Sequence, residues 1–333
     1  MPPSPSWLHP NPNGLFCEPG GFYIDPARPV SRALITHGHS DHARSGHDAY
    51  LATSETVEVM KLRLGPNHNY QSTRYHETHN INGVTVRFIP AGHILGSAQI
   101  LLEWQGQRIV ASGDYKRSLD PTCAPFEPVA CDVFITEATF ALPVFCHEPA
   151  DKEVARLIIS IAQNPDRNHL LGVYGLGKAQ RIIALLRQQG FTHTIWLHGA
   201  LVELCKLYER LGVKLGDVRP VSEADAKTLK GELVLCPPSA THDRWAAKFG
   251  NAITSFASGW MRVRARARQR GAELPLIISD HADWPQLLQT IEDVEAPEIW
   301  VTHGREDALV HQLALMGRKA RALALIGFED EAE

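Results

Sequence analysis

The sequence THGHSDH, residues 36–42, directly follows the apolar run RALI at residues 32–35 and is the strongest signal in the chain. It contains four imidazole or carboxylate side chains, which are common ligands of divalent metal ions. Without cations, these groups would repel one another and lose their hydration without compensation. His37 and His39 alternate at a predicted strand end, so we expect their rings to face one metal ion, while Asp41 and His42 face a second. The competing interpretation is a polar surface turn.

The composition is typical of a globular protein, with 333 residues, 44% hydrophobic and 21% charged. The 33 basic and 37 acidic residues give a formal net charge of −4, which excludes an overall polycation. Six cysteines without a CxxC pair fit reduced thiols better than a disulfide framework or a cysteine-based zinc site. The 17 histidines instead favour metal ligation by imidazole and carboxylate groups.

The sequence predicts no membrane-spanning segment. No stretch approaches the roughly 18 consecutive apolar residues that a transmembrane helix needs. The start, MPPSPSWLHPNPNG, has no basic segment followed by an apolar one, as a secretory signal would. We therefore expect a cytoplasmic protein without membrane partners.

Apolar runs between glycine and proline turns predict the order of the elements. Strands in mostly antiparallel or mixed sheets are expected at residues 21–26, 32–37, 49–53, 84–90, 98–104, 107–114 and 131–139. From about residue 150, helices alternate with buried strands, which predicts an α/β unit with a parallel sheet. A strand at residues 275–283, a helix, a strand at 298–304 and a final helix follow. This order indicates one layered α/β domain interrupted by a second, inserted domain.

The HxHxDH string resembles the metallo-β-lactamase superfamily, and three further motifs of that superfamily follow the expected order. They are Asp25 in GGFYIDP, His93 in PAGHILGSAQ and Asp114 in SGDYKR, each at a predicted strand end. The resemblance implies that Asp25 orients ligating histidines and that Asp114 bridges two metal ions. The metal ligands that it implies are His37, His39, Asp41, His42, His93, Asp114 and His303.

The long interval between Asp114 and His303 resembles the β-CASP nucleases, which carry a cap domain at this point. Glu137 in ITEATF matches motif A of that group, His281 in SDHAD motif B, and His303 in THG motif C. The resemblance implies an α/β fold: a metallo-β-lactamase αββα sandwich with an inserted α/β β-CASP cap domain. The expected boundaries are residues 1–145 and 275–333 for the sandwich and 146–274 for the cap.

Within this group, residues 20–140 resemble the bacterial ligase-associated DNA exonucleases most. That resemblance implies a DNA exonuclease for single-stranded or frayed ends in DNA repair, associated with an ATP-dependent DNA ligase and a helicase. His303 is shared with the RNA-processing branch, whereas Artemis-like members carry valine there. An RNA-processing nuclease therefore remains an alternative, although the short segment after His303 leaves no room for an appended RNA-binding domain. A non-catalytic nucleic-acid scaffold and a small-molecule hydrolase are further alternatives.

The predicted chemistry is hydrolysis of a phosphodiester bond with two divalent ions, Zn²⁺ or Mn²⁺, and a hydroxide shared between them. Asp41 and Asp114 are expected to serve both metal binding and catalysis. His281 is the candidate general acid for the leaving O3′, and Glu137 accepts the other ring N–H of His281. The alternative for His281 is a structural histidine.

Basic residues outside the metal motifs predict where nucleic acid binds. In WMRVRARARQRG, five arginines alternate; on a strand they would share one face as a phosphate ladder, whereas on a helix they would scatter. A charged edge strand is the competing interpretation. GVYGLGKA, residues 172–179, has P-loop spacing but Ala179 in place of the Ser or Thr that holds magnesium, which argues against nucleotide hydrolysis. The expected contacts are Lys116, Arg117, Lys178, Arg262, Arg264, Arg266, Arg268 and Arg270.

Overall fold

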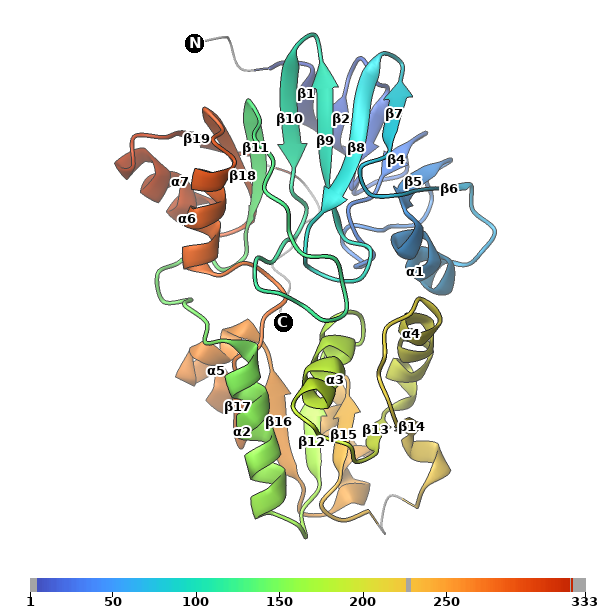
Figure 1. Ribbon diagram of the computed structural model, residues 1–333. Coiled ribbons are helices and arrows are strands. Elements are labelled where there is room, and N and C mark those ends of the chain that lie inside the picture. Colours follow the sequence, from blue (N-terminus) through green and yellow to red (C-terminus); the bar gives the residue numbers. More distant parts are fainter. Residues whose placement is uncertain (1–4, 226–228, 324, 326–333) are drawn as a thin grey trace. The chain divides into compact units, whose positions relative to one another are not determined.

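A computed structural model describes residues 5–225, 229–323 and 325. The chain forms two compact units (Figure 1): unit 1 comprises the described parts of residues 1–144 and 281–332, and unit 2 comprises those of residues 145–280. The second crossing lies later in the chain than the expected boundary at 274/275. The reason is that β17 (Leu274–Leu276) pairs in parallel with β16 (Ile253–Ala257) in the sheet of unit 2.

Unit 1 contains two sheets. The first has the order β1-β2-β3-β4-β5-β6, with β1 (Leu8–Asn11), β2 (Gly14–Cys17), β3 (Phe22–Ile24), β4 (Ala33–Leu34), β5 (Tyr50–Thr53) and β6 (Tyr70–Thr73). The second has the order β19-β18-β11-β10-β9-β8-β7, with β7 (Thr78–Ile81), β8 (Val84–Pro90), β9 (Ala98–Trp104), β10 (Gln107–Ala111), β11 (Val133–Ala138), β18 (Glu298–Gly304) and β19 (Lys319–Ala322). Both sheets mix parallel and antiparallel pairs, as the sequence predicts.

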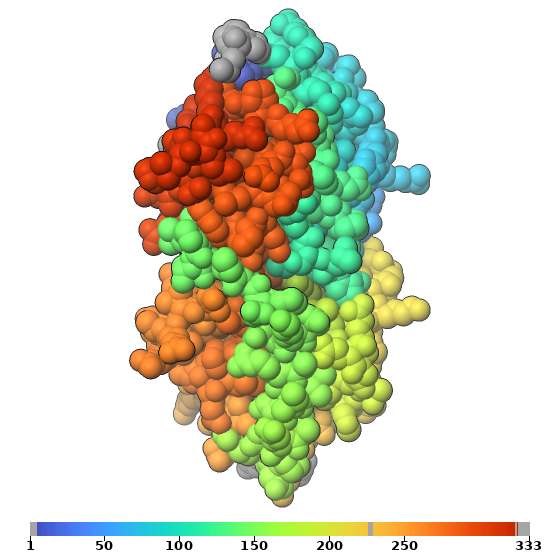
Figure 2. Space-filling view, turned by 60° about the vertical axis from the view of Figure 1, so that its left-hand side comes forward, coloured from blue at the N-terminus to red at the C-terminus, as the bar shows by residue number. Residues whose placement is uncertain are grey.

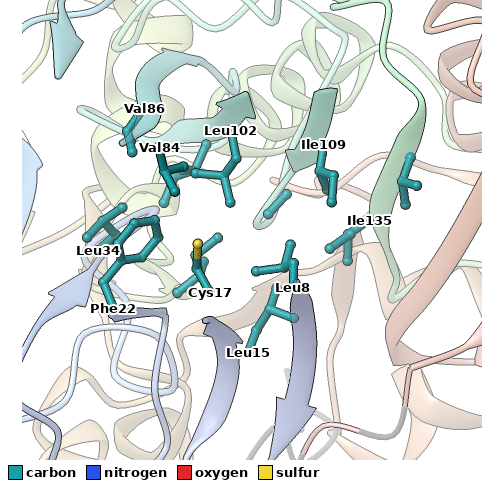
Figure 3. Packing of buried hydrophobic residues seen from close by; sticks show 14 of the residues in the cluster. Leu8, Leu15, Cys17, Phe22, Leu34, Val84, Val86, Leu102, Ile109 and Ile135 are labelled. Carbon is teal, nitrogen blue, oxygen red and sulfur yellow. The ribbon is translucent and has the colours of Figure 1, made fainter. Parts of the chain in front are cut away.

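The core of unit 1 lies between these two sheets (Figure 3). Leu15 and Leu34 of the first sheet pack in one buried cluster with Leu102 and Ile109 of the second. The period of two in a strand directs alternate residues to opposite faces, so Val110 belongs to the cluster on the other face of the second sheet. Burial on both faces explains why the central strands read as nearly continuous apolar runs.

Helices cover the outer faces of both sheets. On the first sheet, Val57 and Met60 of α1 (Ser54–Leu64) pack against Ala52. On the second sheet, α6 (Trp284–Asp293) and α7 (Glu306–Leu315) contribute their apolar residues to the cluster that contains Val301. The segment after residue 280 therefore completes the same layers that the first 144 residues begin.

Unit 2 has one wholly parallel sheet, in agreement with the predicted α/β unit. Its order is β14-β13-β15-β12-β16-β17, with β12 (His169–Gly172), β13 (Ile195–Leu197), β14 (Val218–Pro220) and β15 (Leu233–Cys236). The connecting helices are α2 (Ala150–Gln163), α3 (Lys178–Gln188), α4 (Gly199–Arg210) and α5 (Arg264–Gln269). Short 3-10 helices η1 (Val221–Glu223), η2 (Pro238–His242), η3 (Ala246–Phe249) and η4 (Gly259–Arg262) lie between the later elements.

The strand interpretation of the arginine-rich segment is wrong. Residues 259–262 form η4 and residues 264–269 form α5, so the five arginines do not make a ladder on one strand face. Alanine and arginine are strong helix formers, and Val263 is the only β-branched residue here, so local propensity outweighs the period of two in the charges. Among all described residues, no helix is long and apolar enough to cross a bilayer.

Candidate functional site

The candidate metal ligands gather at one edge of unit 1 because each stands at or just beyond the end of a strand. Parallel strands place their carboxyl ends at the same sheet edge. The THGHSDH loop follows β4, His93 follows β8 and Asp114 follows β10, while Glu137 and His303 lie near the ends of β11 and β18. Residues far apart in the sequence therefore meet within a few ångströms.

The first group contains three histidines and one aspartate. The Oδ2 atom of Asp114 lies 3.4 Å from Nε2 of His37 and 3.7 Å from Nε2 of His93. The Nδ1 atom of His39 lies 3.0 Å from Nε2 of His93. One ligand atom from each of the four residues lies within 4.8 Å of every other, a spacing that one ion can span.

The second group contains Asp41, His42 and His303. The Oδ2 atom of Asp41 lies 3.3 Å from Nε2 of His42 and 3.6 Å from Nε2 of His303. The same Oδ2 atom of Asp114 that faces the first group lies 3.5 Å from Nε2 of His42. Asp114 therefore lies between the two groups, where a carboxylate could be shared by two ions.

The chemistry of these side chains fits divalent cations. Nε2 of His37 and both carboxylate oxygens of Asp114 are buried and have no hydrogen-bond partner among the described residues. Burial lowers the pKa of His37, which favours the neutral imidazole that metal ligation requires. Burial acts to raise the pKa of Asp114, but the imidazoles of His42 and His303 hold this pKa well below its usual value. Asp114 therefore stays anionic although it is buried, and a bound cation would stabilise this charge.

The Asp25 carboxylate stabilises the THGHSDH loop through contacts with Thr36 and His42. Its Oδ1 atom accepts the backbone N–H of Thr36 at 2.8 Å, and its Oδ2 atom accepts the Thr36 hydroxyl at 2.5 Å. Oδ2 also lies 2.7 Å from Nδ1 of His42, so that ring is oriented with Nε2 toward Asp41 and Asp114. These contacts support the orienting role that the motif predicts for Asp25, which stays a prediction.

Backbone conformation at the edge is unusual at several positions. Asp25 has φ 42° and His303 has φ 68°, in the left-handed region that non-glycine residues seldom adopt. Gly113 precedes Asp114 with φ 56°, and a Cβ atom there would lie 2.7 Å from the side chain of Thr36. The glycine thus allows the two ligand loops to approach each other closely.

Glu137 and His281 form a third group with Asp114. The Oε2 atom of Glu137 lies 2.9 Å from Nδ1 of His281, while Oε1 accepts the backbone N–H of Tyr115 at 2.8 Å. Nδ1 of His281 also lies 4.0 Å from Oδ2 of Asp114. Glu137 and His281 are buried, and their contact leaves Nε2 of His281 as the ring nitrogen directed elsewhere.

Three supporting residues were missed at the sequence level. Arg63 of α1 donates from Nη1 to the carbonyl of Gly38 in the ligand loop at 2.5 Å. The Thr139 hydroxyl donates to Oε2 of Glu137 at 2.6 Å, and Oε1 of Glu306 accepts the backbone N–H of His303 at 3.1 Å. No sequence signal marks Arg63. Thr139 follows Glu137 by two residues and Glu306 follows His303 by three, so only their closeness to a motif could have indicated them.

Three of the predicted nucleic-acid contacts have side chains engaged within the protein. Lys116 is buried and donates from Nζ to the carbonyl of His281 at 3.3 Å. The Arg117 guanidinium pairs with Asp293 at 2.6 Å. Lys178 is fully buried. The burial of Lys116 and Lys178 argues against the expected substrate contacts of these two lysines. Arg117 is partly exposed in its ion pair, so its contact with substrate stays a prediction.

The five arginines of the helical segment are all exposed, and Figure 2 shows this segment (orange) at the surface of unit 2. The Arg266 guanidinium stacks over the Trp260 ring at 3.8 Å from its centroid, and Arg270 lies over Phe256 at 5.2 Å. Trp260 is itself buried, so its ring supports the arginine more than it offers a face to a base. The remaining exposed arginines of the segment are Arg262, Arg264 and Arg268.

Several known proteins are similar to this chain, although no protein-family model matches it. The chain is 28% identical over 313 residues to "Probable DNA ligase" from Opitutus terrae, covering 90% of this chain and 29% of that protein. It is 30% identical over 173 residues to "Endoribonuclease YSH1" from Gibberella zeae, covering 50% of this chain and 20% of that protein. Both relatives are much longer than the part that this chain matches.

Two further similarities extend over most of the chain. "Cleavage and polyadenylation specificity factor subunit 3" from Dictyostelium discoideum is 25% identical over 286 residues, covering 70% of this chain and 37% of that protein. The crystal structure of a protein of unknown function from Enterococcus faecalis V583 superposes with a TM-score of 0.60 at 13% identity, covering 89% of this chain and 80% of that chain. At that identity, the match shows a similar fold alone. The ordered motifs and these relatives together support the resemblance of this chain to the β-CASP nucleases of the metallo-β-lactamase superfamily.

Proposed function

We propose that this protein is a metal-dependent DNA exonuclease that hydrolyses phosphodiester bonds at single-stranded or frayed ends during DNA repair. In this proposal, unit 1 is the metallo-β-lactamase αββα sandwich and unit 2 is the β-CASP cap domain. The observation that carries it is the position of Asp114 between two histidine-containing ligand groups, within 3.4 to 3.7 Å of His37, His42 and His93. A cytoplasmic location stays a prediction.

The chemistry is divided between the ligand groups and the third group. When bound, two divalent ions such as Zn²⁺ or Mn²⁺ would activate water and polarise a phosphoryl oxygen. The first group, with Asp114, would hold one ion and Asp41, His42 and His303 the other. His281 would donate a proton from Nε2 to the leaving O3′ atom, while Glu137 accepts the N–H at Nδ1 and stabilises the charged ring. The products would carry a 5′-phosphate and a 3′-hydroxyl.

The choice of DNA rests on similarity across nearly the whole chain. The match to the protein named as a probable DNA ligase covers 90% of this chain, whereas the match to the named endoribonuclease covers 50%. A chain that resembles one part of a longer ligase-named protein also supports a functional association with a DNA ligase. A helicase partner and 5′ to 3′ digestion rest on the family resemblance.

An RNA-processing nuclease is the second candidate. The 30% identity to the named endoribonuclease favours it, and the same ligands and the same pair of Glu137 and His281 would serve RNA equally. In the proposed mechanism, the attacking group comes from water, so hydrolysis would not involve the 2′-hydroxyl. The two candidates are therefore separated by substrate binding and not by the metal centre.

The deciding experiment uses single-stranded DNA and RNA of the same sequence, each labelled at the 5′ or the 3′ end. Purified protein is stripped of metal and then supplied with Mn²⁺ or Zn²⁺, beside the Asp114→Ala variant. Metal-dependent loss of the DNA label, absent in the variant, would support the proposal, and the label released first gives the polarity. Preferential cleavage of RNA would move the protein to the second candidate. Cleavage of neither substrate would contradict both.

A further inference from the structure

Residues 277–280, which directly precede His281, are bound by three buried charged side chains of unit 2: Glu153, Lys178 and Arg181. The Oε2 atom of Glu153 in α2 accepts the backbone N–H of Ile277 at 2.9 Å. Arg181 in α3 donates from Nη1 to the carbonyl of Ser279. Asp280, which ends the stretch 145–280 of unit 2, pairs with two cations of α3: its Oδ1 lies 3.4 Å from Nη1 of Arg181, and its Oδ2 lies 3.5 Å from Nζ of Lys178.

Lys178, Arg181 and Asp280 form a buried cluster of charges. Because desolvating these charges costs free energy, each side chain must keep its partners, and this restricts the cluster. Lys178 is 0% exposed, Arg181 2% and Asp280 4%. Buried ions persist only where their partners satisfy them, and removing one partner leaves an uncompensated charge. The ammonium of Lys178 also lies 5.3 Å from the centroid of the Tyr174 ring, so packing fixes it as well. A segment held in this way has little freedom in its backbone.

His281, the next residue, is held within unit 1 by separate contacts. Lys116 donates to its carbonyl at 3.3 Å, and the backbone N–H of Ala282 donates to the carbonyl of Tyr115 at 2.7 Å. Glu137 fixes the ring through Nδ1 at 2.9 Å. The residue with the proposed acid function thus stands at the crossing of the chain between units, with anchored main chain on both sides.

We propose that Lys178, Arg181 and Asp280 are positioning residues that fix the main chain before His281 and thereby aim its Nε2–H at the leaving O3′ atom. The inference rests on the proposed function, because it assigns no separate chemistry to the cluster. It also gives the glycine turn before α3 a purpose that nucleotide binding does not. Lys178 and Arg181 of that helix pair with Asp280, so the turn does not present them to a phosphate.

The test compares two substrates that differ in their need for an acid. Single-stranded DNA releases an alkoxide that must be protonated, whereas bis(p-nitrophenyl) phosphate releases a phenolate that leaves without a proton. Lys178→Met is the main variant, because it leaves one buried cation, Arg181, opposite one buried anion, Asp280. We expect kcat on DNA to fall about 10- to 100-fold, with KM within about twofold and with less than about threefold change on the nitrophenyl ester.

Matched variants separate positioning from folding. Arg181→Lys, which keeps the charge, should lose less activity on DNA than Arg181→Met. Asp280→Asn should show the same difference between the two substrates as Lys178→Met. If Asp280→Asn does not fold, Lys178→Met and Arg181→Met carry the test. Arg167→Gln breaks an exposed ion pair with Glu273 in the same unit and should leave kcat on both substrates unchanged.

The outcomes distinguish this inference from the proposed function. Absence of DNA hydrolysis by the wild-type protein would contradict the proposed function itself. If the wild-type protein cuts DNA and His281→Ala loses DNA activity selectively, then unchanged kcat in Lys178→Met would overturn the positioning role. Equal losses on both substrates would also overturn it, because they would indicate a general structural defect.

Discussion

The two units treat their ionisable side chains in opposite ways. At the metal edge of unit 1, seven histidines and carboxylates form two groups, and the ligand atoms within each group lie within 4.8 Å of one another. Asp114 and His37 are essentially buried. On unit 2, the five arginines of the η4 and α5 segment are exposed on a short helix. Both regions are dense in charge, but only the first removes that charge from water.

This difference determines how each region responds to change. Buried charges interact strongly and depend on every partner, so one substitution disrupts the whole group. Exposed charges act through water and are screened within about 8 Å at physiological salt, so each contributes a small, additive share. We therefore expect sharp losses at the metal edge and gradual, salt-dependent losses at the arginine segment.

Asp114→Ala should produce the largest effect, since it removes the carboxylate between both ligand groups. We expect nuclease activity to fall by about a thousandfold or more, together with the number of tightly bound ions per chain. Elemental analysis after metal loading and desalting measures the second quantity. The exposed Asp48→Asn is the matched control and should keep both at the wild-type level. Full metal content in Asp114→Ala would exclude a shared ligand.

His281→Ala should lower turnover by about 100-fold or more while metal content stays near the wild-type value, because the family resemblance assigns proton transfer and not metal ligation to His281. Glu137→Gln should follow it with a smaller loss, since the amide keeps a hydrogen bond to Nδ1 but not the charge. Single-turnover rates and elemental analysis check both. An unchanged rate in His281→Ala would remove this histidine from the mechanism.

The arginine segment should show the gradual response. The triple variant Arg262→Gln, Arg264→Gln and Arg268→Gln removes exposed charges and leaves the stacked Arg266 and Arg270 in place. If each of the three neutralises one phosphate, the slope of log affinity against log salt for single-stranded DNA should fall by about 2. KM should rise about tenfold at low salt, with kcat nearly unchanged.

A matched triple variant on α4 tests whether position matters beyond charge. Lys206→Gln, Arg210→Gln and Lys214→Gln removes the same number of exposed cations from or next to another helix of unit 2. Its salt slope should remain close to that of the wild-type protein. Equal changes in both triple variants would indicate that net charge alone attracts the substrate, without an interface at the arginine segment.

The metal edge was predictable because its signal is local and chemical. THGHSDH places four ligand-type groups in one loop, and strand-end logic carries His93 and Asp114 to the same edge. The arginine segment was not, because a period of two in charge competes with a helix propensity that the same alanines and arginines supply. The period of two describes only the spacing of the charges, whereas the helix propensity of alanine and arginine determines the backbone conformation.

The sequence also could not predict which residues, far apart in the chain, contact each other. Lys178 has P-loop spacing, and its burial follows from Asp280, which stands about a hundred residues later in the chain. Arg63 supports the ligand loop from a helix that carries no motif. In both cases the sequence names the residue type correctly, but only the tertiary fold supplies the partner that decides its role.

The smallest predicted effect concerns a buried histidine of unit 2 that has no metal role. His169 lies at the start of β12, its Nε2 is 2.8 Å from the Ser160 hydroxyl, and burial lowers its pKa from 6.5 to about 4. The unfolded chain thus binds more protons between these values, so stability is full above pH 6.5 and is lost as the pH falls toward 4. Between pH 7 and pH 5, the free energy of unfolding should fall by about 1 to 2 kcal/mol through this group.

Urea unfolding of the full chain at both pH values, in the wild-type protein and in His169→Gln, isolates that contribution. The glutamine cannot be protonated and can still bond to Ser160, so its unfolding free energy should depend less on pH by that amount. The exposed His193→Gln is the matched control and should keep the wild-type dependence. If His169→Gln also keeps it, the pH response belongs to the histidines of the metal edge, and the contrast between the two units would extend to their acid stability.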